Sequence, residues 1–163
     1  MTKKFAALQS LILAGGSIFA WYTVFGDFKR FLNAGGEILN FSGCRFPNPL
    51  ATPCFYGAIV FLIALIWSVL IYQKIDNTQR LASQKKLNFL LLAGTIFAWS
   101  NFGYEMYKFY QPHTEPFLSC SGTLAQHPIY TPCFTGAIIY LAAFITSLIF
   151  VKALKKDAQQ ANI

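Results

Sequence analysis

The sequence predicts an all-α membrane protein, a four-helix transmembrane bundle made of two tandem helical hairpins. Hydrophobic residues make up 55% of the 163 residues and charged residues only 12%, whereas about a quarter of a soluble domain is charged. Four apolar stretches are each close to the ~20 residues that a helix needs to cross a bilayer. Sequence motifs recur between the two halves. Two helices per half keep both halves in one orientation, so we expect a pseudo-twofold axis along the membrane normal.

The expected elements follow from these stretches, because backbone in hydrocarbon must satisfy its own hydrogen bonds and therefore forms helices. The first hairpin covers residues 1–73, with spans at 5–26 and 54–73 around an outer loop at 27–53. A cytoplasmic linker follows at 74–86. The second hairpin covers residues 87–156, with spans at 87–109 and 133–151 around an outer loop at 110–132, before a polar tail at 157–163. The start of the chain also fits a cleaved signal peptide, but the recurrence of its motif in the third stretch favours a retained helix.

The internal repeat is visible as two matched pairs of segments. Residues 16–21 (Gly-Ser-Ile-Phe-Ala-Trp) match residues 94–99 (Gly-Thr-Ile-Phe-Ala-Trp) at an offset of 78. Residues 52–59 match residues 131–138 at an offset of 79, and one of the eight positions differs. Both of the latter segments begin with Thr-Pro-Cys-Phe, which a general apolar bias does not produce. The repeat therefore indicates a duplicated hairpin.

The lysines and arginines predict the orientation. Nine of the 13 lie at the chain ends or in the central linker, and four lie on the other side. By the positive-inside rule both termini and the linker are cytoplasmic and the two cysteine-bearing loops face outward. We expect a plasma membrane, by default a bacterial inner membrane. The net charge of +7 does not indicate nucleic acid, because the basic residues form short clusters between apolar runs.

All four cysteines fall on the predicted outer side. In an oxidising compartment this pattern is typical of disulfides, and the repeat favours one bond per hairpin, Cys44–Cys54 and Cys120–Cys133. The residues before the second cysteine of each pair suit a helix start: Thr52 and Thr131 as N-caps, then Pro53 and Pro132 at the first helical position.

The arrangement of four helices, cytoplasmic ends and two outer cysteine pairs resembles the layout of the quinone-linked proteins DsbB and vitamin K epoxide reductase. Pro53-Cys54 is similar to the Pro-Cys that begins the redox motif of DsbB. That resemblance implies a thiol–disulfide oxidoreductase with a quinone cofactor and four catalytic cysteines, Cys44, Cys54, Cys120 and Cys133. The sequence departs from the motif because Gly57 and Gly136 stand where its second cysteine belongs.

Two further groups of residues are candidate sites. Asp27 with Arg30, and Glu105 with Lys108, have the i,i+3 spacing of helical ion pairs. We expect solvated pairs at the outer interface, and the alternative is a symmetric pair of polar gates. His113 and His127 share the second loop with Cys120 and Cys133, but their spacing fits no zinc pattern, so we expect no metal site.

No catalytic constellation stands out. The sequence therefore favours a non-enzymatic scaffold or accessory subunit, whose disulfide-tied outer loops contact another membrane or extracytoplasmic protein. The first alternative is the thiol–disulfide oxidoreductase, and the second is a small-solute transporter or channel.

Overall fold

The computed structural model describes residues 2–38, 48–73, 77–111, 119 and 123–160. Within these ranges all regular secondary structure is helical, and no β-strand occurs. The four long helices are α1 (Thr2–Asn33), α2 (Pro53–Gln73), α3 (Asn77–Phe109) and α4 (Pro132–Gln160). Two 3₁₀ turns, η1 (Pro49–Ala51) and η2 (Pro128–Tyr130), lie directly before α2 and α4. The prediction of an all-α fold is confirmed for these residues.

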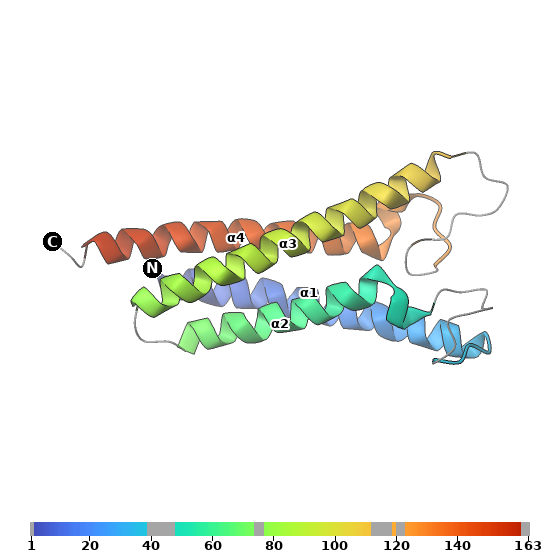
Figure 1. Cartoon of the computed structure of the whole chain (residues 1–163), viewed down its shortest axis with the longest axis horizontal. Coiled ribbons are helices and arrows are strands. Elements are labelled where there is room, and N and C mark those ends of the chain that lie inside the picture. Colours follow the sequence, from blue (N-terminus) through green and yellow to red (C-terminus); the bar gives the residue numbers. More distant parts are fainter. Residues whose placement is uncertain (1, 39–47, 74–76, 112–118, 120–122, 161–163) are drawn as a thin grey trace.

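The helices form an elongated bundle in which consecutive helices run in opposite directions (Figure 1). α1 and α3 each pack against both α2 and α4. The start of α1, the end of α2, the start of α3 and the end of α4 lie at one end of the bundle, called here the terminal end (Figure 1). The end of α1, the start of α2, the end of α3 and the start of α4 lie at the opposite end, called here the loop end. The first turns of α2 and α4, which carry cysteines, therefore lie together at the loop end.

Three helices are long and apolar enough to cross a membrane, and these candidate spans cover Lys4–Asn33, Pro53–Gln73 and Pro132–Asp157. The remaining helix, α3, is 33 residues long, but polar residues such as Asn88 and Asn101 interrupt its apolar part. The structure thus supports a membrane protein with three candidate spans, and a fourth span in α3 stays a proposal.

The helices extend beyond the apolar stretches. α1 continues past its expected end to Asn33, and α4 ends at Gln160, inside the segment 157–163 expected as a polar tail. α3 starts at Asn77, so most of the expected linker 74–86 is helical. Apolar length reports the thickness of hydrocarbon, whereas lysine, arginine, glutamine and alanine continue a helix readily outside it.

Two glycines allow aromatic rings to lie directly on helix backbones. A Cβ atom on Gly16 would lie 2.6 Å from Phe61 Cε1 and 2.9 Å from Ile139 Cγ2, and one on Gly94 would lie 2.6 Å from Tyr140 Cε1. The rings of Phe61 and Tyr140 stack with centroids 3.8 Å apart. Gly16 and Gly94 are equivalent positions of the repeat, as are Phe61 and Tyr140. Such small residues let helices approach closely in lipid, where the hydrophobic effect does not drive them together.

Polar contacts join the helices nearer the terminal end. Arg80, in the first turns of α3, is 4% exposed and donates from Nε and Nη2 to the carbonyls of Ile71 and Tyr72 at 3.3 and 3.4 Å. These carbonyls belong to the last turn of α2, where the helix dipole favours a cation. Arg80 therefore fastens the end of α2 to the start of α3.

A buried amide pair crosses the bundle one turn further in. Gln84 Nε2 of α3 donates to Gln9 Oε1 of α1 at 2.8 Å and to Ser147 Oγ of α4 at 3.0 Å. Each of these three residues is fully buried. The contacts connect the diagonal helices α1 and α3 through side chains, with α4 as a third member.

Candidate functional site

The two cysteine-bearing helices begin in the same way at the loop end. The side chains of Asn48 and His127 accept hydrogen bonds from the amides of Leu50 and Ile129 at 3.0 and 3.3 Å. Each caps a 3₁₀ turn that starts at a buried proline, and the Thr-Pro-Cys segment follows. The prolines stand at positions 49 and 128, again 79 residues apart. This shared proline extends the repeat to positions before the matched segments 52–59 and 131–138.

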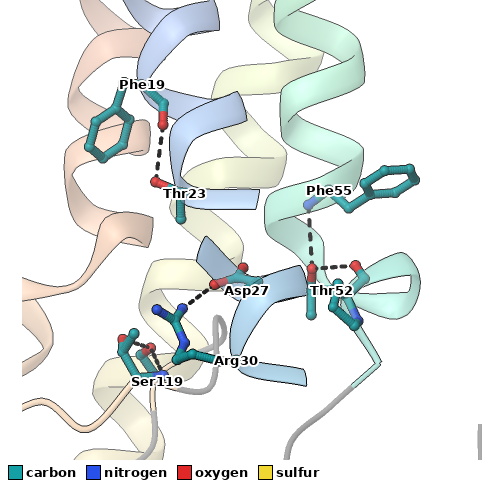
Figure 2. A network of polar contacts seen from close by, with 9 residues as sticks. Phe19, Thr23, Asp27, Arg30, Thr52, Phe55 and Ser119 are labelled. Carbon is teal, nitrogen blue, oxygen red and sulfur yellow. Dashed lines mark hydrogen bonds and ion pairs between the residues drawn. The ribbon is translucent and has the colours of Figure 1, made fainter. Parts of the chain in front are cut away.

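In the first hairpin the N-cap threonine bonds within its own turn. Thr52 Oγ1 accepts from the Phe55 amide at 3.4 Å and donates to the Pro49 carbonyl at 2.7 Å (Figure 2). Asp27 of α1 is 4% exposed and forms an ion pair with Arg30, three residues on in the same helix (Figure 2). The second carboxylate oxygen of Asp27, Oδ2, has no hydrogen-bond partner among the described residues.

In the second hairpin the equivalent groups meet each other. The Thr131 hydroxyl lies 2.8 Å from Glu105 Oε2 and 2.7 Å from the Pro128 carbonyl, and its single proton serves one acceptor at a time. Glu105 is 4% exposed. Lys108 places its ammonium 4.7 Å from the centroid of the Tyr104 ring. Both repeated carboxylates are thus buried by protein, which differs from the solvated ion pairs that we expected.

A cavity of about 60 Å³ lies between the four helices near the loop end. Fifteen residues line it, and 14 of them form seven pairs of equivalent repeat positions. The pairs are Phe19 with Phe97, Ala20 with Ala98, Thr23 with Asn101, Pro53 with Pro132, Cys54 with Cys133, Gly57 with Gly136, and Phe61 with Tyr140. Equivalent positions of the two halves therefore lie around this cavity in pairs.

The polar side chains around the cavity bond to nearby backbone. Thr23 Oγ1 donates to the Phe19 carbonyl at 3.0 Å, and Asn101 Nδ2 donates to the Phe97 carbonyl at 2.8 Å. The Tyr140 hydroxyl donates to the carbonyl of Gly57 at 2.8 Å and so joins α4 to α2. With these protons engaged, the cavity presents mainly carbon, sulfur and aromatic rings.

Two of the four cysteines lie among the described residues. Cys54 and Cys133 lie in the first turns of α2 and α4 and line the same cavity. Cys44 and Cys120 lie outside the described residues. The pairings Cys44–Cys54 and Cys120–Cys133 therefore stay predictions. Nothing in the sequence indicated that Cys54 and Cys133 would share a cavity.

His127 has a structural role in its turn. Its Nδ1 accepts the Ile129 amide, and its ring lies 5.0 Å from the ring of Phe109, centroid to centroid. The residues described by the structure contain no group of three or more His, Cys, Asp or Glu side chains arranged to hold a metal ion. His113, the other histidine, lies outside them.

Comparisons with protein families, with curated proteins and with solved structures find no match for this chain. The resemblance of its layout to DsbB and vitamin K epoxide reductase therefore depends on the features of the sequence itself. Gly57 and Gly136, which replace the second cysteine of the redox motif, both line the cavity.

Proposed function

We propose that the protein is a multi-pass membrane protein of two tandem hairpins, with α3 as its fourth span and a pseudo-twofold axis along the membrane normal. The seven matched pairs around the cavity support the symmetry, as does the shared close approach at Gly16 and Gly94. The distribution of lysine and arginine supports a cytoplasmic terminal end and an outer loop end in a plasma membrane, by default a bacterial inner membrane.

Within this architecture the protein is a non-enzymatic scaffold or accessory subunit whose loop end contacts another membrane or extracytoplasmic protein. One observation carries this proposal. Five large hydrophobic side chains at the end of the second hairpin are between 46% and 79% exposed, namely Tyr107, Tyr110, Leu124, Ile129 and Tyr130. Four of them follow the end of α3 and precede α4. Aromatic residues, tyrosine among them, are enriched in protein interfaces.

Photocrosslinking in cells tests the proposed interface. A photoreactive amino acid replaces Tyr110 or Tyr130, and the matched control replaces Ile18, which is 73% exposed in the middle of the α1 span. We expect one discrete protein adduct at the two loop-end positions and none at the control. Adducts with lipid alone at Tyr110 and Tyr130, or the same adduct at Ile18, would contradict the proposal.

In this proposal the disulfides Cys44–Cys54 and Cys120–Cys133 hold the outer loops against the helix starts. Each closes a short loop and should stabilise the folded state by about 2–3 kcal/mol. Their reduction potentials are measured by equilibrating the protein with graded thiol buffers and counting alkylated thiols by mass spectrometry. Potentials below about −300 mV identify structural disulfides. Potentials near about −200 mV or above identify labile bonds and favour the second candidate.

The second candidate is a membrane thiol–disulfide oxidoreductase, favoured by the position of Cys54 and Cys133 on one cavity. A substrate dithiol would lose two electrons and two protons and become a disulfide, while one cysteine pair of the protein is reduced to two thiols. A quinone would then accept the two electrons and two protons and become a quinol. Folded Cys54→Ser and Cys133→Ser variants that keep full biological activity would eliminate this candidate.

A further inference from the structure

A groove between α2 and α3 near the terminal end combines apolar walls with two lysines. Its volume is about 540 Å³. Trp67 of α2 forms one wall, and the other wall consists of Lys85, Lys86, Phe89, Leu90 and Ala93 of α3.

The lining residues of α3 follow one face of the helix. Lys85, Phe89 and Ala93 are spaced by four residues, as are Lys86 and Leu90, so they stand in neighbouring rows on the helix surface. Lys85 and Ala93 are about 12 Å apart along the axis, at ~1.5 Å per residue. The face therefore presents positive charge at one end and apolar side chains over the next two turns. A phospholipid has the matching order of charge and hydrocarbon along its length.

The two lysines are available for a ligand. Both are exposed, and neither forms an ion pair with a carboxylate of the described residues. The nearby guanidinium of Arg80, in contrast, is bonded to the end of α2. Ala7 and Leu8 occupy the equivalent positions of the first hairpin, so the hairpin fold itself does not require lysines there.

We infer that this groove binds an anionic phospholipid from the surrounding bilayer, with its phosphate held by Lys85 and Lys86. One acyl chain lies along Phe89 and Leu90, opposite the indole of Trp67. Basic pockets between transmembrane helices on the cytoplasmic side are suited to anionic headgroups. The inference rests on the proposed architecture, with α3 as a span and the terminal end in the cytoplasm. It does not depend on the proposed scaffold function, and either can fail while the other holds.

A second groove near the same end provides an internal comparison. It lies between α1 and α2, has a volume of about 400 Å³, and no charged residue lines it. Its walls include Ala7, Ser10 and Leu11 of α1 and Val69 and Tyr72 of α2. Lipid chains can lie in either groove. Of the two, the α2–α3 groove has charged side chains that can favour an anionic headgroup over a neutral one.

The test uses the full chain in detergent, titrated with phosphatidylglycerol or phosphatidylcholine and read by native mass spectrometry and by the thermal midpoint. We expect the protein to retain phosphatidylglycerol preferentially. The double variant Lys85→Gln/Lys86→Gln should bind phosphatidylglycerol more weakly by on the order of tenfold. The matched control Lys155→Gln/Lys156→Gln removes the same charge near the end of α4 and should retain the preference.

Three outcomes would overturn the inference. The first is equal retention of the two lipids by the unmodified protein. The second is an equal loss in the two double variants, which would indicate a general surface charge effect. The third is an identical thermal shift with soluble glycerol phosphate, which would indicate a phosphate site without a lipid chain.

A fluorescence measurement keeps the inference testable if the lysine variant does not fold. The chain has three tryptophans, and Trp21→Phe/Trp99→Phe leaves Trp67 as the single emitter. Phosphatidylglycerol with brominated chains should quench Trp67 at a lower mole fraction than brominated phosphatidylcholine, and added salt should reduce the difference. Identical quenching curves would contradict binding in this groove.

Discussion

The two hairpins bury a carboxylate at the same position of the repeat but give it different partners. In the first hairpin Asp27 pairs with Arg30 of its own helix. In the second hairpin Glu105 accepts from the hydroxyl of Thr131, 26 residues away in the turn before α4. A partner in the same helix stabilises that helix, whereas a partner in the next element also holds two elements together. The two equivalent positions thus both carry a buried acid, but the partners of the two acids differ.

The aromatic pair at the inner wall of the cavity shows the same divergence. Phe61 and Tyr140 stack on each other, and each lies against the glycine of its own hairpin. Tyr140 adds a hydroxyl that bonds to the Gly57 carbonyl of the first hairpin. At this level the second hairpin therefore supplies the donor, and the first hairpin supplies the carbonyl acceptor, of a polar contact between α4 and α2.

The largest loss of stability is expected for alanine substitutions at the two equivalent glycines, Gly16 and Gly94. Gly16→Ala should lower the free energy of unfolding by about 2 kcal/mol, because overpacking costs ~1–3 kcal/mol. The new methyl group would meet Phe61 of α2 and Ile139 of α4 at once. Gly94→Ala should have a smaller effect, about 1 kcal/mol, because the three atoms nearest to its Cβ all belong to the Tyr140 ring.

Unfolding in mixed micelles, followed by circular dichroism, measures this difference. Gly15→Ala is the matched control, since nothing lies within 4 Å of a Cβ at that position. Alanine is a better helix former than glycine by up to about 1 kcal/mol, so the control should be neutral or stabilised. A Gly16→Ala variant as stable as Gly15→Ala would refute the close packing of α1 against both neighbours.

A smaller effect is expected at the carboxylates. Asp27→Asn should lower the free energy of unfolding by about 1.5 kcal/mol, the lower end of the range for hydrogen bonds to charged groups. The lower end applies because the side chain of Arg30 is 39% exposed, so solvent screens the ion pair. Glu105→Gln should cost less, because the new amide oxygen still accepts from Thr131. A double-mutant cycle with Arg30→Gln isolates the Asp27–Arg30 coupling. Equal losses for Asp27→Asn and Glu105→Gln, with no coupling to Arg30, would remove the contrast between the hairpins.

The smallest loss of stability is expected when the two equivalent aromatic positions, Phe61 and Tyr140, carry the same residue. Tyr140→Phe removes one hydrogen bond to the Gly57 carbonyl and should lower the free energy of unfolding by about 1 kcal/mol. Tyr22→Phe is the control, because Tyr22 is 78% exposed on α1. The same unfolding assay serves both variants. If both had the same stability as the unmodified protein, the Tyr140 hydroxyl would have no role in joining α4 to α2.

The sequence was a good guide wherever a local rule decides the structure. Pro53 and Pro132 open α2 and α4, as expected for proline after a threonine cap. The start of α3 was placed less well, because no proline or glycine marks the polar residues from Asn77 onward. The end of α1 was expected at residue 26, but the helix continues to Asn33 and stops before Gly35, which has a positive φ. The i,i+3 spacing indicated Asp27 with Arg30 correctly.

The candidate site was less predictable because its contacts join distant parts of the chain. The same i,i+3 spacing gave no hint that Thr131 would bond to Glu105. The matched segments include Phe19, Pro53 and Gly57, which line the cavity, but only packing decides that equivalent positions from both hairpins face each other. A sequence shows which residues recur, and it leaves open whether the copies meet or point apart.

The contact between Gly16 and Ile139 has a consequence for biosynthesis. It joins α1, the first of the four helices to be synthesised, to α4, the last. During translation α1 and α2 can pair as they leave the ribosome. The surface of α1 at Gly16 and the carbonyl of Gly57 reach their partners, Ile139 and Tyr140, only after α4 has been made. Bundle assembly is therefore a late event, and insertion intermediates that stop before α4 will offer their unfinished surface to membrane chaperones and proteases.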